Sequence, residues 1–183
     1  MIITHHREKL INAIIHFAKN TRYCGKTKLM KLLFFLDFSH FKQTGKSVTG
    51  LDYYAWEMGP VPKDLFEELD AMKPDLKGAV SIASGEFRKI IPGKAFDQTH
   101  FTKREMELLE KISFIFRDAR AEDMIEVTHL KNEPWHKTLA QKGPFSKIDY
   151  LLAIDNTMDS LSLDQIKERI CEISEMHDML GIV

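Results

Sequence analysis

Three residues in the second half of the chain, His129, Glu133 and His136, carry side chains that can ligate a metal or transfer a proton. A catalytic zinc needs three protein ligands and an open position, and two of the ligands normally lie close together on one helix. The two histidines are seven residues apart with Pro134 between them, which matches no common zinc spacing. We therefore predict that His129 ties two helices together by capping or hydrogen bonding, and that the protein holds no metal or other cofactor.

The sequence holds no motif for phosphate binding or for a catalytic nucleophile. Gly25, Lys26 and Thr27 resemble the end of a phosphate loop, but Asn20 stands where the first glycine of that loop is required. There is no G-x-S-x-G nucleophile elbow, and no pair of carboxylates has a spacing that identifies an acid and a base. We predict that the protein is not an enzyme. The enzymatic alternative, action on a small molecule, needs His129 in a deep pocket with a carboxylate in reach.

A second group of residues combines positive charge with aromatic rings. Lys28, Lys31 and Lys42 fall on one stripe with Phe35 and Phe38, on a helix predicted over about residues 27–43. Lysines around a buried helix commonly extend their charged ends to its rim. The alternative is a contact strip for a partner protein, with the rings as anchors. These five residues are therefore the candidate partner-binding residues.

A helical scaffold is predicted to position these side chains. A first helix over about residues 7–19 has one apolar stripe. The helix over 27–43 is apolar nearly all round, which places it at the centre of the fold, and Gly45 is a suitable stop. Further helices are predicted from Pro62 to Pro74, from the capping box Thr102–Glu105 to about Ala119, over 121–130, from Pro134, and over about 162–180 after the capping box Ser162–Gln165.

The strands are predicted from aromatic and β-branched runs between glycines and prolines. One strand covers 51–58 and ends at a corner over 59–62; a hairpin over 87–91 and 95–101 joins it in one sheet, and 147–154 is ambiguous between helix and strand. Trp56 and Trp135 are predicted core anchors that need an acceptor for the indole N–H. The predicted fold is mainly α (α+β), with six to seven helices around a central apolar helix and a small antiparallel sheet of two to three strands.

Composition excludes several classes of protein. The chain has 183 residues, which suggests one domain over 1–183, and its net charge of −1 does not support strong nucleic-acid binding. Its longest apolar run, Leu32–Leu36, is far shorter than the roughly 20 residues of a membrane span. Cys24 and Cys171 lie far apart, which favours reduced thiols, although a disulfide stays open. We expect a cytoplasmic protein without a signal peptide or membrane contact.

Three segments, over 28–35, 55–61 and 128–135, resemble the Panacea domain family, also called the SocA-like or phage-associated antitoxin domain. The family pattern reads K-L-x-K-L-L-Y, a glycine near the helix end, A-W-x-x-G-P-V, and T-H followed by P-W. Gly45 takes the glycine position, and Phe34 stands where the family has tyrosine. The resemblance covers about residues 7–154. The matching residues, expected to be mainly structural, are Lys28, Leu29, Lys31, Leu32, Leu33, Trp56, Gly59, Pro60, Val61, Thr128, His129, Pro134 and Trp135.

The resemblance implies a mostly helical domain with a small sheet that acts as the antitoxin of a toxin–antitoxin pair. Its partner would be a cognate toxin encoded nearby, which it neutralises by direct protein–protein binding. One family member instead delivers its toxin to a Clp-type protease as an adaptor. The alternative function is a winged-helix-like transcriptional regulator, with Arg88, Lys89 and Lys94 on the wing. Nucleic acid is the less favoured partner because the net charge is close to zero.

Overall fold

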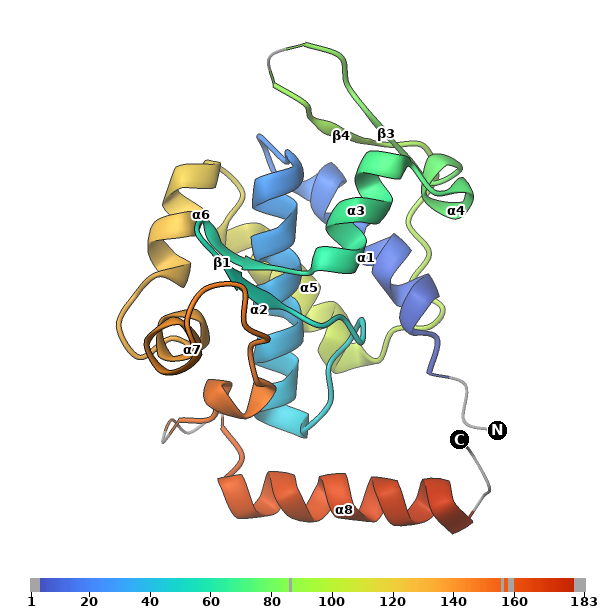
Figure 1. Cartoon of the computed structure of the whole chain (residues 1–183). Coiled ribbons are helices and arrows are strands. Elements are labelled where there is room, and N and C mark those ends of the chain that lie inside the picture. Colours follow the sequence, from blue (N-terminus) through green and yellow to red (C-terminus); the bar gives the residue numbers. More distant parts are fainter. Residues whose placement is uncertain (1–3, 86, 156, 158–159, 180–183) are drawn as a thin grey trace.

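The computed structural model describes residues 4–85, 87–155, 157 and 160–179 (Figure 1). In chain order the elements are α1 (His6–Asn20), α2 (Lys26–Thr44), β1 (Tyr54–Trp56), β2 (Gly59–Val61), α3 (Lys63–Ala71), α4 (Pro74–Lys77), β3 (Val80–Ile82), β4 (Ile90–Pro92), α5 (Lys103–Ile115), α6 (Ala121–Thr128), α7 (Pro134–Lys142), the 3₁₀-helix η1 (Tyr150–Ala153) and α8 (Leu163–Met179). The mainly α fold class is confirmed, with eight α-helices in the described part of the chain.

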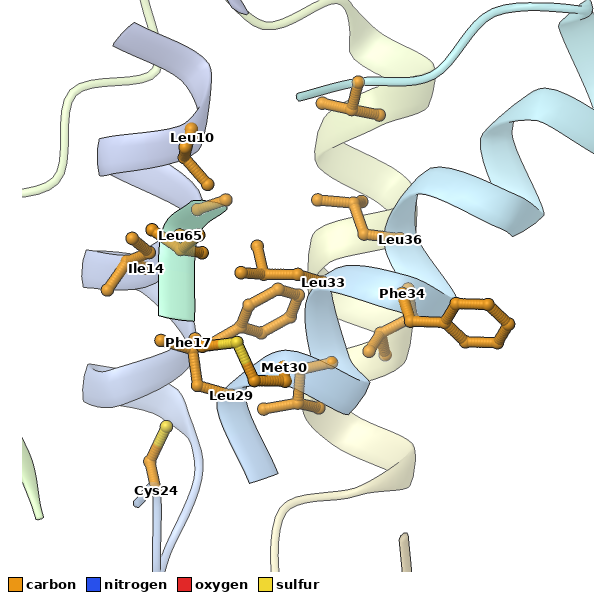
Figure 2. Close-up of a cluster of buried hydrophobic side chains, with 14 of the residues drawn as sticks. Leu10, Ile14, Phe17, Cys24, Leu29, Met30, Leu33, Phe34, Leu36 and Leu65 are labelled. Carbon is orange, nitrogen blue, oxygen red and sulfur yellow. The ribbon is translucent and has the colours of Figure 1, made fainter. Parts of the chain in front are cut away.

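Helix α2 runs through the middle of the molecule, as its apolar sequence predicts (Figure 1). It contacts α1, α5, α6, β2 and η1. Figure 2 shows Leu33 on the side of α2 that faces α1, whereas Phe34 points away from α1. On that second side the ring of Phe38 stacks on Tyr150, with 4.3 Å between ring centroids. Burial of each such side chain contributes about 1.5–3 kcal/mol to stability, so both of these sides of α2 contribute to the core.

The end of α2 and the loop after it are fixed by backbone and polar interactions. Gly45 adopts a φ of 75° and donates its N–H to the carbonyl of Phe41, which confirms the predicted stop. The buried carboxylate of Asp37 accepts hydrogen bonds from the backbone N–H groups of Val48 and Thr49. The hydroxyls of Thr49 and Tyr53 also donate to it. Burial raises the pKa of Asp37, and the four donors hold the loop that leads into β1.

Strands β1 and β2 form a tight antiparallel hairpin that reverses at Glu57–Met58. The predicted single strand over 51–58 with a corner over 59–62 is therefore wrong. Pro60 in β2 lies opposite Ala55 in β1. A proline fits there because the backbone N–H and carbonyl of Ala55 point away from β2 and form hydrogen bonds with another segment. The Ala55 N–H donates to the carbonyl of Ser146, and its carbonyl accepts from the N–H of Phe145. Pro60 therefore costs no hydrogen bond in the hairpin.

Strands β3 and β4 form a second, separate sheet, in which Ser81 lies opposite Ile91. The predicted hairpin over 87–91 and 95–101, and its sheet with 51–58, are therefore wrong. Val80 and Ile90 belong to the hydrophobic core, and this burial sets the pairing. Residues 83–85 and 87–89, between β3 and β4, extend away from the body of the molecule (Figure 1).

The two capping boxes fix the starts of α5 and α8. Thr102 and Glu105 bond reciprocally at the start of α5, and Ser162 and Gln165 do so before α8. Helix α5 ends at Ile115, earlier than predicted, and the ambiguous segment contains η1. Helix α8 lies across the lower end of α2 (Figure 1), and residue 180, its predicted end, falls outside the described residues. Both cysteines are free thiols.

Candidate partner-binding surfaces

The first motif lysine, Lys28, is fully buried and joins two loops. Its Nζ donates to the carbonyls of Arg22, Phe116 and Ala119 at 2.7, 2.7 and 2.6 Å. These three acceptors use the three N–H donors of an ammonium group. Burial lowers the pKa of Lys28, and the carbonyl oxygens compensate part of the desolvation. Lys28 therefore ties the turn between α1 and α2 to the loop between α5 and α6.

The second motif lysine, Lys31, is also buried but has a poorer set of acceptors. In the described part of the chain its Nζ donates to one group, the carbonyl of Pro60, at 2.9 Å. Burial lowers the pKa of Lys31 to about 7. Gly59 lies beside it with a φ of 97°, and a Cβ at Gly59 would stand 2.8 Å from the Thr128 hydroxyl oxygen and 3.0 Å from the Lys31 Cε. Residues of all three motifs thus meet at this point.

The two tryptophans connect β1 to α7. Trp135 is buried and donates its indole N–H to the backbone carbonyl of Trp56 at 2.8 Å, the acceptor that the sequence required. Trp56 is half-buried and packs against Phe66. The His129 ring stacks on Trp135, with 3.8 Å between centroids and 5° between planes. Trp135 therefore anchors both neighbours to the core.

His129 is the C-cap residue of α6, which agrees with the predicted capping role, and its ring joins α6 to α7 by stacking rather than by a side-chain hydrogen bond. Its Nε2 is buried and has no hydrogen-bond partner among the residues that the structure describes. Burial and the charge of Lys31 lower the pKa of His129, which favours the neutral ring. The remaining motif residues are also buried, namely Leu29, Leu32, Leu33, Val61 and Pro134. The motifs thus build the interior.

The five candidate partner-binding residues do not form one surface. Lys28, Lys31 and Phe38 are buried, because the sides of α2 that carry them are covered by other elements. Phe35 and Lys42 are half-buried and line a groove between α2 and α5. Only these two members of the predicted strip therefore remain at the surface.

The groove between α2 and α5, which we call the α2–α5 groove, has a volume of about 260 Å³. In it the ring of Phe35 stacks on Phe116, with 4.9 Å between centroids. Phe114 and Ile115, next to Phe116 on the chain, are 73% and 56% exposed. The lining combines five apolar with four polar or charged side chains, and it consists of Phe35, Ser39, Lys42, Gln43, Leu108, Lys111, Ile112, Ile115 and Phe116.

A larger hollow, which we call the basic cleft, has a volume of about 640 Å³ and lies where α1 and α5 end. Its lining comes from the end of α1, the turn after it, the β3–β4 loop and the residue Arg117. Every charged residue in this lining is a cation. Sequence reasoning missed the cleft because its parts lie in three distant segments. Its lining consists of Ala18, Lys19, Asn20, Thr21, Arg22, Tyr23, Phe87, Lys89 and Arg117.

His129 is not part of a cluster of metal ligands among the residues that the structure describes. Over that part of the chain no three His, Cys, Asp or Glu side chains gather to hold a metal ion. His129 lines neither the α2–α5 groove nor the basic cleft. Among the described helices, none has the length and apolar character needed to span a membrane.

The fold and these surfaces define a mainly α-helical protein with packed motifs and two aromatic, cation-bearing hollows. Residues 29–136, more than half of the chain, match the family model described as antitoxin SocA-like, Panacea domain. The chain belongs to this family, as the three motifs predict. No curated protein and no solved structure matches the chain.

Proposed function

We propose that the protein is the antitoxin of a toxin–antitoxin pair and neutralises a toxin encoded nearby by direct binding rather than by catalysis. The observation that carries this proposal is the family match over residues 29–136, because the family is described by its antitoxin activity. The burial of most motif residues supports the proposal indirectly. Because these residues build the core, binding of a partner must use other residues, at the surface. We place the complex in the cytoplasm.

The α2–α5 groove is the surface that we assign to the toxin. Ile115 lines this groove and is 56% exposed, beside the stacked rings of Phe35 and Phe116, and apolar side chains that gather at the surface commonly mark a binding site. Aromatic anchors with cations at the rim are typical of the residues that dominate binding energy. A toxin seated here over about 1,200–2,000 Å² would have its active site or substrate path covered.

A growth assay with co-expressed proteins tests the proposal. The adjacent open reading frame is expressed alone, with the wild-type protein, and with the variant Ile115→Asp. We expect toxicity alone, growth with the wild type, and loss of rescue with Ile115→Asp, because a carboxylate in the groove opposes apolar contact. Met58→Asp, at an exposed residue outside the groove, is the matched control and should rescue. A harmless neighbour, or one that stays toxic beside the wild type, contradicts the proposal.

Two finer roles stay predictions. An adaptor for a Clp-type protease would shorten the half-life of the toxin in cells that express both proteins and the protease. A promoter-binding regulator would shift its own promoter in a gel at about 150 mM salt, because specific binders lie near 10⁻⁸–10⁻¹¹ M. The residues predicted for the wing are divided: Arg88 and Lys89 precede β4, whereas Lys94 follows it and lies beside Gly78.

A further inference from the structure

The basic cleft has a local charge that the chain as a whole lacks. Its lining carries Lys19, Arg22, Lys89 and Arg117, all exposed, whereas the net charge of the chain is −1. The remainder of the chain is therefore net acidic. Arg22 forms an exposed ion pair with Asp118, which contributes little to stability. Within the described residues the other three cations form no side-chain ion pair, so their charge is not neutralised locally.

The cleft is held in shape by groups other than its cations. Lys28 lies behind it and binds the carbonyls of Arg22 and of the loop after α5. The Arg22 N–H donates to the Arg117 carbonyl at 2.7 Å, and the Ile90 N–H donates to the Cys24 carbonyl at 2.9 Å. Three distant segments are thus fixed through their backbones. The cationic side chains are consequently free to meet a ligand without a change in the fold.

Two exposed rings stand among these cations. Tyr23 and Phe87 are 44% and 50% exposed, and they meet edge to face with 6.4 Å between centroids. The Arg120 guanidinium lies 5.0 Å from the Tyr23 ring centroid. We propose that the basic cleft binds an acidic segment of the toxin, with carboxylates on the cations and an apolar side chain against the rings. This inference rests on the proposed antitoxin function.

The basic cleft and the α2–α5 groove are adjacent on the chain. Ile115 and Phe116 line the groove, and the next residue, Arg117, lines the cleft. The two hollows therefore share the chain segment at which α5 ends. A duplex of nucleic acid carries one charge per about 1.7 Å of its length, so it would need a longer run of cations than the four in this lining. A short acidic protein segment ends within the cleft, which makes it the better fit.

A charge-reversal experiment tests this inference with the full chain. The cleft variant is Lys89→Glu with Arg117→Glu, and the matched control is Lys63→Glu with Lys77→Glu, at two exposed lysines outside the cleft and the groove. Both variants change the net charge equally. The Kd for the product of the adjacent open reading frame is measured at about 50 and 200 mM salt, a range over which screening of exposed charges rises strongly.

We expect the cleft variant to bind at least about tenfold more weakly than the wild type at the lower salt and to lose most of its salt dependence. The control variant should stay within about twofold of the wild type, since its charges lie away from the partner. Equal affinity of the cleft variant and the wild type overturns the inference and leaves the antitoxin function standing. A wild type that does not bind the neighbouring product overturns both.

A second probe separates protein from nucleic acid. A single-stranded oligonucleotide of 20 nucleotides is titrated into the wild type and the cleft variant. We expect no binding at micromolar protein. Micromolar binding that is lost in the cleft variant, with unchanged affinity for the toxin, would assign the cleft to nucleic acid and overturn the inference.

Discussion

Lys28 and Lys31 lie one turn apart on α2, and both are buried, yet the regions around them are built differently. Around Lys28, carbonyl oxygens from two loops surround the ammonium. Around Lys31, one carbonyl accepts a hydrogen bond, Gly59 and the Thr128 hydroxyl pack closely, and the His129 ring lies near enough for the charge of Lys31 to lower its pKa. A buried charge is costly unless it is hydrogen-bonded, so the two lysines stabilise the fold to very different extents.

This difference gives the two lysines of the motif over 28–35 different structural roles. Lys28 holds the loops that carry Arg22 and Arg117, and it thereby shapes the basic cleft from within. Lys31 contacts the β1–β2 hairpin, where Gly59 and Thr128 leave little free space. The Lys28 region therefore depends on charge and hydrogen bonding, and the Lys31 region depends on close packing. Four changes test this comparison.

The largest expected effect is that of Lys28→Met. Three carbonyls would lose a charged donor inside the protein, and we expect the free energy of unfolding to fall by about 3–5 kcal/mol. Urea unfolding followed by circular dichroism measures the change. Lys42→Met, on the same helix but at a half-exposed ion pair with Asp155, should cost less than about 1 kcal/mol. Similar losses for both variants contradict the comparison.

Gly59→Ala should have the next largest effect. A side chain there is strained by the φ of 97° and collides with Thr128 and Lys31. Gly143 also has a positive φ, of 84°, but a Cβ there meets nothing within 4 Å. We expect Gly143→Ala to lose about 1 kcal/mol from backbone strain alone and Gly59→Ala to lose about 1–3 kcal/mol more from overpacking. Chemical denaturation of both variants gives the difference, and equal losses would show that the hairpin is not tightly packed.

Stability should depend on pH through Lys31. Its pKa of about 7 in the folded protein is below the ordinary value of 10.5, so the unfolded chain binds more protons between these values. The contribution of Lys31 to the free energy of unfolding therefore rises with pH between about 7 and 10.5, by about 1 kcal/mol per pH unit. This contribution is lost as the pH falls toward 7. Lys31→Met should remove this part of the slope. Denaturation midpoints at pH 7, 8 and 9 measure it, and parallel slopes in both proteins contradict the assignment.

Trp135→Phe should have the smallest effect of the four. The variant keeps an aromatic ring beside His129 but loses the hydrogen bond from the indole N–H to the Trp56 carbonyl. One neutral hydrogen bond contributes about 1 kcal/mol, which corresponds to a fall in Tm of about 2–4 °C for a chain of this size. Calorimetry measures the fall. A loss as large as that of Lys28→Met would mean that the tryptophan itself, and not close packing around Gly59, holds this region together.

Local signals in the sequence predicted the helical part of the fold. The apolar pattern of α2, the stop at Gly45 and the capping box at Thr102 each depend on neighbours within a few residues, and the structure contains them all. The hairpins escaped prediction because their pairing depends on distant contacts. Pro60 is accepted in β2 only because Ala55 pairs with the segment at Phe145 on its other side.

The surface was harder to predict than the core for the same reason. From the sequence, Lys28 is expected to extend its charged end to the rim of the helix. It is buried instead, because it binds backbone carbonyls that lie about ninety residues later in the chain. The basic cleft likewise combines Arg22, Lys89 and Arg117, which no local pattern connects. The family resemblance needed only the order of three motifs, so it could be recognised without these contacts.

Calorimetric titration of the purified protein with the product of the adjacent open reading frame tests the central claim most directly. An antitoxin that acts by direct binding predicts a saturable complex with a Kd below about 10⁻⁶ M. It also predicts that Ile115→Asp weakens the complex at least about tenfold, while Met58→Asp leaves it unchanged. A folded wild-type protein that shows no binding to this neighbour at micromolar concentrations contradicts the account.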